Sequence, residues 1–268
     1  MSAGNISISV SIVLYELDKT ALQNCLDSLK TTIQSCDPTM GSISWHAKLI
    51  DNGNNSSALS SFPSENLSVL NNPENIGYGA AHNQVIMTAT SDFHLILNPD
   101  VVLDQDYLQY TIKLMISKQN IVLASPYGVN AQGNNAYLCK RYPSLLILLI
   151  RGLGQKHLSR LFKNRIARYE YQDLTTSKVT KVELLSGCCI FARTRSIQKA
   201  GGFDKNFFLY FEDFDLSLRM REFGKIVFVP KAKIIHFGGN AAKKGLLHIF
   251  FFVRSAARFF RKYGWKFF

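Results

Sequence analysis

The chain has 268 residues, 47% hydrophobic and 19% charged, a composition that excludes a disordered chain and a simple multi-pass membrane protein. This length fits one large domain, or a domain with an appendage, that buries its own core. The net charge of +12 predicts a polyanionic partner: a nucleic acid, an anionic membrane surface or a phosphorylated substrate.

Targeting and redox signals are few. The N-terminal stretch MSAGNISISVSIVLY has no basic region and no small-residue cleavage site, so we do not expect secretion. The longest apolar run, at 145–150, is far shorter than the roughly 20 residues of a spanning helix. The five cysteines are odd in number and show no CxxC spacing, which favours reduced thiols in a cytosolic protein over a zinc site.

The first half of the chain alternates between strand-like and helix-like stretches. β-Branched residues at 6–15 indicate a strand, and apolar residues at helical spacing within 20–32 indicate a helix. We then expect strands at 45–53 and 67–72, a helix at 79–90, a strand at 93–98, a helix at 104–118 capped by Asp104, and a strand at 121–126. This order predicts an α/β fold with a mostly parallel central sheet and helices on both faces.

The second half is less regular. Residues 140–182 are basic with an apolar core and no clean period, so we expect an irregular segment, either an insertion or a flexible stretch. The remaining elements should be a strand at 182–194, a loop running into a helix within 207–224, and a strand, turn and strand at 225–239. We divide the chain into a domain at 1–240 and a basic aromatic helix or tail at 241–268.

Polar residues follow three of the predicted strands, where parallel sheets bind their ligands. They are Tyr15 and Glu16, Asp51 and Asn52, and Asn98 with Asp100. Pro99 fixes the backbone before Asp100, and a hard oxygen ligand beside phosphates suits Mg²⁺ or Mn²⁺. Asp51 could accept a hydrogen bond from a pyrimidine N–H. The structural alternatives are a capped turn for Asp100 and an Asx-turn for Asp51.

Three further features suggest a site. Gly77 and Gly79 open a helix, which allows close backbone approach to a ligand, although the spacing is not that of a phosphate loop. His236 ends a strand; it is either structural or completes a metal shell begun by Asp100.

Glu212, Asp213 and Asp215 crowd the start of a helix below an aromatic run. They either complement the helix dipole or supply a general base and the neighbour that orients it.

In combination, NIGYGAAHN, LNPDV, LLSGCCIFARTRSIQKAGGFDKNFFLYFEDFDLSLR and the segment around His236 resemble the inverting family-2 glycosyltransferases with the GT-A fold. Within them the chain is similar to the rhamnosyltransferase-like branch, over roughly residues 7–240. The resemblance implies that Asp51 recognises the nucleotide base and that Asp213, oriented by Glu212, deprotonates the acceptor hydroxyl. It also implies that Asp100 and His236 bind Mg²⁺ or Mn²⁺. The implied nucleotide-sugar site comprises Tyr15, Glu16, Asp51, Asn52, Gly77, Asn83, Asn98 and Asp100.

The chain departs from this pattern at three places. Asn98 replaces the first aspartate of the Asp-x-Asp metal motif, which weakens the expected metal binding. Leu14-Tyr15-Glu16 replaces Thr-Tyr-Asn after the first strand, which affects base and ribose contacts. Ala241 stands where a serine often follows the histidine and glycine, which removes one phosphate contact.

The activity that this resemblance implies is transfer of a hexose, L-rhamnose from dTDP-L-rhamnose, to a lipid-diphosphate-linked saccharide in bacterial cell-surface polysaccharide synthesis, of the O-antigen or capsule type. Galactosyl, glucosyl or galactofuranosyl transfer from a UDP-sugar is the alternative. A nucleic-acid-binding protein would leave the strand-end acids unexplained, because carboxylates repel phosphate, so we expect no nucleic-acid partner. The Glu212-Asp213 pair argues against an inactive, lectin-like relative.

The C-terminal residues form a basic and aromatic helix when wound at about 100° per residue. One side carries Arg254, Arg258, Arg261 and Lys262, and the other carries Phe252, Val253, Ala256, Phe259, Phe260 and Tyr263. The apolar side could dock on the domain, or the aromatic residues beside the arginines could lie at the surface of an anionic membrane. We expect a cytoplasmic protein peripherally associated with the inner face of the cell membrane.

Overall fold

The computed structural model describes residues 5–62, 64–153, 161–238 and 245–268. Its strands are β1 (Ile6–Leu14), β2 (Ile43–Asp51), β3 (Leu67–Asn71), β4 (Phe93–Leu97), β5 (Val101–Leu103), β6 (Ile121–Val129), β7 (Cys139–Lys140), β8 (Thr180–Lys181), β9 (Leu184–Leu185), β10 (Cys189–Arg193) and β11 (Lys225–His236). Its α-helices are α1 (Lys19–Gln34), α2 (Ser56–Leu59), α3 (Tyr78–Ile86), α4 (Tyr107–Ser117), α5 (Leu145–Leu153), α7 (Lys163–Tyr169), α8 (Thr194–Lys199), α9 (Glu212–Met220) and α10 (Gly245–Tyr263).

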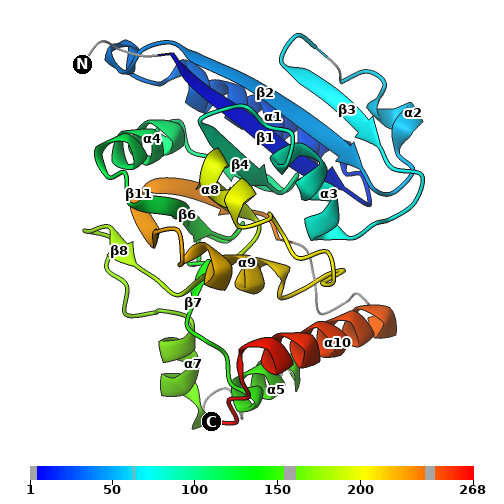
Figure 1. Cartoon of the computed structure of the whole chain (residues 1–268), viewed down its shortest axis with the longest axis vertical. Coiled ribbons are helices and arrows are strands. Elements are labelled where there is room, and N and C mark those ends of the chain that lie inside the picture. Colours follow the sequence, from blue (N-terminus) through cyan, green and yellow to red (C-terminus); the bar gives the residue numbers. More distant parts are fainter. Residues whose placement is uncertain (1–4, 63, 154–160, 239–244) are drawn as a thin grey trace.

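The central sheet has the strand order β3-β2-β1-β4-β10-β6-β11-β5, and β8 adds to β11. Strands β3, β2, β1 and β4 run parallel, as do β6 and β11, while β10 lies antiparallel between β4 and β6 (Figure 1). The alternation of strands and helices up to β4 and the α/β fold with a mostly parallel sheet are therefore confirmed.

The sheet must curl. Strands β4 and β5 are separated by residues 98–100 alone, yet they occupy the fourth and last places in the strand order. Four strand spacings measure about 19 Å, whereas the four residue steps from Leu97 to Val101 reach about 14 Å at most. A flat sheet cannot satisfy both values, so curling brings β5 and its partner β11 back toward the end of β4.

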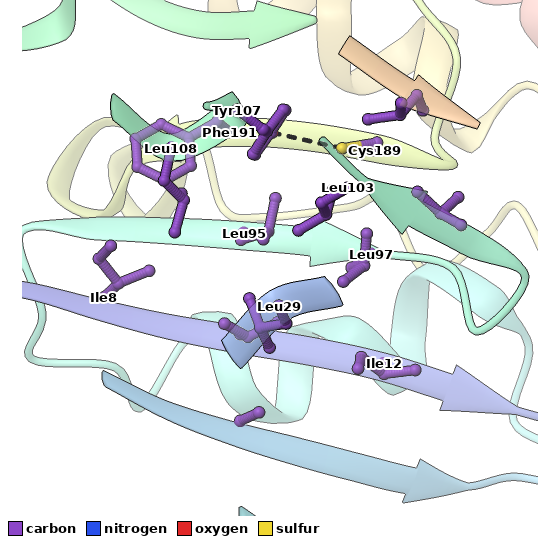
Figure 2. Packing of buried hydrophobic residues seen from close by; sticks show 14 of the residues in the cluster. Ile8, Ile12, Leu29, Leu95, Leu97, Leu103, Tyr107, Leu108, Cys189 and Phe191 are labelled. Carbon is purple, nitrogen blue, oxygen red and sulfur yellow. Dashed lines mark hydrogen bonds between the residues drawn. The ribbon is translucent and has the colours of Figure 1, made fainter. Parts of the chain in front are cut away.

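Helices cover both faces because alternate residues of a buried strand point to opposite sides. Leu95 and Leu97 of β4 pack in the cluster that contains α1 and α4, whereas Ile96 packs in the cluster that contains α3, α8 and α9. Figure 2 shows the first cluster, with Leu29 of α1 and Leu108 of α4 beside the sheet.

The structure differs from the sequence-based prediction in several places. The 140–182 segment is not irregular where described: it contains α5 and α7, and α5 lacks a period because its first six residues are all apolar. Helix α4 begins after Asp106, and Asp104 instead accepts a hydrogen bond from the Asp106 amide in the preceding turn. Strand β11 is continuous, with a bulge between Val229 and Lys233 that accommodates a proline lacking an N–H donor.

Helix α10 docks its apolar side on the domain, the first of the two arrangements expected for the tail. Ala256, Phe259 and Phe260 are buried against Phe207 and Phe211, which precede α9. Among the described residues, no helix combines the length and the apolarity needed to cross a bilayer.

Candidate active site

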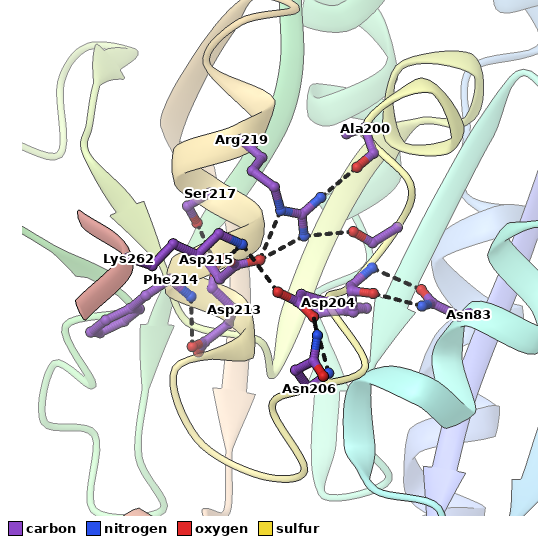
Figure 3. Close-up of polar contacts among 12 residues, drawn as sticks. Asn83, Ala200, Asp204, Asn206, Asp213, Phe214, Asp215, Ser217, Arg219 and Lys262 are labelled. Carbon is purple, nitrogen blue, oxygen red and sulfur yellow. Dashed lines mark hydrogen bonds and ion pairs between the residues drawn. The ribbon is translucent and has the colours of Figure 1, made fainter. Parts of the chain in front are cut away.

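The Glu212-Asp213 pair lies at the first turn of α9, after two residues in the left-handed region, Tyr210 (φ 69°) and Phe211 (φ 64°). This conformation is costly for bulky side chains and is retained only where surrounding contacts hold it. One oxygen of Asp213 accepts from the Gly187 amide at 2.9 Å. The other accepts from the Phe214 amide at 2.8 Å, the contact drawn in Figure 3. The carboxylate therefore has a fixed orientation.

The two acids differ in protonation. Glu212 is buried and its Oε2 has no hydrogen-bond partner among the described residues, so burial, together with the charge of Asp213, raises its pKa well above the usual range. Burial raises the pKa of Asp213 only to about 6, because amide hydrogen bonds and the nearby Lys140 ammonium favour its charged form. Burial thus opposes ionisation of both acids, while the Gly187 and Phe214 amides favour the charged form of Asp213. Asp213 is also the partly exposed member of the pair, as the predicted general base requires.

Asp100 and His236 are brought together by the β5–β11 pairing, in which His236 lies opposite Val101. His236 Nε2 lies 3.5 Å from Asp100 Oδ1, and both side chains are partly exposed. No group of three or more potential metal ligands occurs among the described His, Cys, Asp and Glu residues. A two-residue site of this kind fits Mg²⁺ or Mn²⁺ bound jointly by protein, phosphate oxygens and water.

Tyr15 and Asp51 meet at one turn beyond β1 and β2. The Asp51 carboxylate is buried and accepts from the Gly53 amide, Asn55 Nδ2 and Ser56 Oγ at 2.9–3.1 Å, which is the Asx-turn considered from the sequence. Gly53 is required here because a Cβ would lie 1.7 Å from the Tyr15 carbonyl oxygen. A carboxylate has about four lone-pair sites, so the turn leaves one unused, which the predicted base contact would need. The exposed Tyr15 follows β1, and its carbonyl contacts the same turn. Glu16 is also exposed.

Three predicted ligand residues make their contacts within the protein. Asn52 is buried and bonds to Asn72, Asn75 and the Ile76 amide, which shapes the loop before α3.

The Asn83 side chain bonds to both the amide and the carbonyl of Phe203, so it joins α3 to the loop after α8 (Figure 3). The close approach that Gly77 permits is to the protein itself, since a Cβ would lie 2.6 Å from the Phe208 carbonyl oxygen. Asn83 and Gly77, like Asn52, position neighbouring segments.

Tyr78 links the two halves of the site. Its hydroxyl lies 2.9 Å from Asn98 Oδ1 and 2.8 Å from the Gly187 carbonyl oxygen, and it can donate to either. Gly187 in turn donates its amide to Asp213. Asn98 therefore lies in a chain of contacts that joins the strand end before Asp100 to Asp213.

Sequence reasoning missed Tyr78 and Lys140. Lys140 of β7 is largely buried, donates to the Tyr137 carbonyl and lies 3.9 Å from Glu170; burial, with a contribution from the Arg151 charge, lowers its pKa to about 7. It stands in the segment that we predicted to be irregular, so no periodicity marked it as an inward-facing residue. The signal for Gly187 was available, because this residue lies in the LLSGCCIF stretch that carries the family resemblance. Ala241 lies outside the described residues.

Residues 9–200 match the model of the family described as glycosyl transferase family 2. The chain belongs to glycosyl transferase family 2. Its fold agrees with this membership, because the similar solved structures are GT-A glycosyltransferases.

Several characterised relatives of this family-2 chain are rhamnosyltransferases. It is 27% identical over 206 residues to the N-acetylglucosaminyl-diphospho-decaprenol L-rhamnosyltransferase of Mycobacterium tuberculosis, covering 70% of this chain and 65% of that protein. It is also 27% identical over 171 residues to the rhamnosyltransferase WbbL of Escherichia coli K12, covering 60% of this chain and 61% of that protein. The chain thus spans a little less than two thirds of these relatives.

Solved structures share the fold at lower identity. GalNAc-T7 with UDP, GalNAc and Mn²⁺ superposes with a TM-score of 0.60 and 16% identity, covering 86% of this chain and 43% of that one. Staphylococcus aureus TarS 1–349 with UDP-GlcNAc superposes with a TM-score of 0.59 and 13% identity, covering 90% and 62%.

Proposed function

We propose that the protein is an inverting hexosyltransferase that moves L-rhamnose from dTDP-L-rhamnose to a lipid-diphosphate-linked saccharide. The Asp213 carboxylate, held by the Gly187 and Phe214 amides beside the buried Glu212, carries the proposal, since it supplies a positioned base. The names of two relatives support L-rhamnose as the sugar, and the name of the mycobacterial relative supports the lipid diphosphate. We further propose that the enzyme is cytoplasmic and acts at the inner face of the cell membrane.

The proposed reaction is a single displacement. Asp213 takes the proton of the acceptor hydroxyl as its oxygen attacks the anomeric carbon from the face opposite the nucleotide. The bond between that carbon and the diphosphate oxygen breaks, and the nucleoside diphosphate leaves with the electron pair, so the configuration inverts. Asp100 and His236 would hold the divalent ion, which would neutralise charge on the leaving diphosphate.

We expect dTDP to stabilise the protein against heat more with Mg²⁺ or Mn²⁺ than with EDTA. At 100 times its dissociation constant, a ligand adds about 2.7 kcal/mol to the free energy of unfolding, which a thermal-shift assay detects. Asp100→Asn and His236→Ala should each abolish the difference between metal and EDTA, whereas the exposed Glu65→Gln should retain it. Equal stabilisation with and without metal in the wild type would remove the metal role.

The same assay with dTDP-L-rhamnose, UDP-galactose and UDP-glucose tests the donor. Preferential stabilisation by a UDP-sugar, followed by its turnover, would replace rhamnosyl transfer with the alternative activity.

Turnover should fall about tenfold for each pH unit below about 6, because Asp213 must be ionised to accept a proton. Lys140→Met should move this acid limb to higher pH, since the ammonium that lowers the pKa of Asp213 is then absent. Lys30→Met, an exposed lysine on α1, is the matched control and should leave the profile unchanged. An unmoved acid limb in Lys140→Met would show that Lys140 has no part in setting this pKa.

A further inference from the structure

The outer side of α10 carries large apolar side chains that remain exposed. Leu246, Leu247, Ile249, Phe250 and Val253 are 57–85% exposed, although the opposite side of the helix is buried on the domain. A contiguous apolar patch of this kind marks a contact surface more often than a free one.

The residues after α10 extend this surface. Trp265, Phe267 and Phe268 are 49–78% exposed, and the carbonyls of Lys266 and Phe267 accept from the first amides of α5 at 2.8 and 3.2 Å. Helices α10 and α5 and the C-terminus lie together at the end of the molecule opposite the N-terminus (Figure 1). We call the exposed apolar residues of α10 and the C-terminal Trp265, Phe267 and Phe268 the interfacial surface.

The charged residues that α10 and the C-terminus themselves carry have one sign, although Lys262 pairs with Asp204 and Asp215 of the domain. Residues 245–268 contain five Lys or Arg and no Asp or Glu. Arg254 and Arg261 are exposed and lie about 40° and 20° from Phe250 around the helix axis. Aromatic rings beside arginines fit the boundary between lipid headgroups and acyl chains, where rings enter the apolar layer and guanidinium groups meet phosphates.

We propose that the interfacial surface docks in the plane of a bilayer that contains anionic lipids. The apolar side chains insert into the boundary between headgroups and acyl chains, and the arginines favour vesicles with anionic headgroups. Binding of this surface to a bilayer requires neither the nucleotide-sugar donor nor the acceptor, so it can be measured without glycosyl transfer.

Trp265 provides a direct reporter, because the only other tryptophan is Trp45 in β2. In Trp45→Phe, we expect the emission of Trp265 to shift to shorter wavelength when phosphatidylcholine vesicles containing phosphatidylglycerol are added. The shift should diminish as salt screens the headgroups. An emission spectrum unchanged by vesicles at low salt would overturn the proposal.

Cosedimentation with the same vesicles separates the two contributions. Leu246→Ser/Ile249→Ser/Phe250→Ser should reduce the bound fraction at least about tenfold, since burial of large apolar side chains drives interfacial binding. Arg254→Glu/Arg258→Glu/Arg261→Glu should remove the preference for anionic vesicles, whereas Lys19→Glu/Lys30→Glu/Lys118→Glu, with the same change in net charge, should keep it.

Circular dichroism tests whether each variant is folded, and light scattering tests whether the protein self-associates. A wild-type dimer that the serine variant dissociates, with no change in vesicle binding, would assign the surface to a second copy instead. Equal loss of binding in both charge-reversal variants would mean that net charge alone, and not this surface, attracts the bilayer.

Discussion

Asp213→Asn should lower turnover at least about 100-fold, the usual minimum loss when a general base is removed. The asparagine oxygen can still accept from the Gly187 amide, so the side chain keeps its place while losing basicity. Donor affinity should remain nearly unchanged, because the carboxylate acts on the acceptor. Turnover and donor affinity measured in parallel test this expectation.

Two controls separate catalysis from folding. Burial and the charge of Asp213 raise the pKa of Glu212 well above its usual range, which favours its neutral form, so Glu212→Gln should affect turnover less than Asp213→Asn.

Because the folded-state pKa of Asp213 is raised, its ionised form at neutral pH opposes folding, and that penalty fades as pH falls through about 6. Asp213→Asn should therefore be at least as heat-stable as the wild type at neutral pH. Near-normal turnover, or a loss confined to donor affinity, would move the base elsewhere.

Asp215→Ala should have the largest effect on stability, lowering the free energy of unfolding by about 3 kcal/mol, the low end for breaking a buried ion pair. The fully buried carboxylate accepts from Arg219 at 2.7 and 2.8 Å on one oxygen (Figure 3). The other oxygen accepts from Lys262 at 2.6 Å and Tyr263 at 2.7 Å. Both cations are partly exposed and can regain water, which limits the loss. Urea unfolding measures the effect.

Lys262→Met is the matched partner variant. It should cost less, because Asp215 keeps Arg219 and Tyr263 and the lysine side chain is 37% exposed. A loss below about 1 kcal/mol in Asp215→Ala would show that the buried contacts only offset the desolvation of the charges.

Helices and strands were predictable where burial of one side gives the apolar residues a regular spacing along the sequence. Helix α1 buries Leu22, Cys25, Leu26 and Leu29 on one side, and Asp18 caps its first turn, so the sequence marks both the side and the start. Helix α5 was missed because its apolar residues run consecutively, which removes the contrast between a buried and an exposed side.

The candidate site residues could be named from the sequence, but the contacts among them could not. Proximity of Asp100 and His236 depends on a pairing of β5 with β11, more than 120 residues apart, that no local pattern specifies. Asp51 could be read as a turn residue or a base ligand, and only the three hydrogen bonds show how much of its carboxylate the turn uses. The metal and nucleotide roles stay predictions.

The loop before α9 is held from two sides. On one side, the Tyr78 amide of α3 donates to the Phe208 carbonyl. On the other side, the Ser255 hydroxyl of α10 donates to the Leu209 carbonyl at 2.8 Å. Further contacts with α10 are the stacking of Phe208 on Phe251 and the hydrogen bond between Tyr210 and His248.

A shortened enzyme ending before α10 would therefore lose more than the proposed membrane-binding surface. It would uncover Phe207 and Phe211 and remove the contacts that α10 makes with the loop preceding Asp213. A variant with weaker membrane binding, for use in assays, should instead keep the whole chain and replace side chains on the outer side of α10. Substitution there leaves the contacts around Asp213 in place.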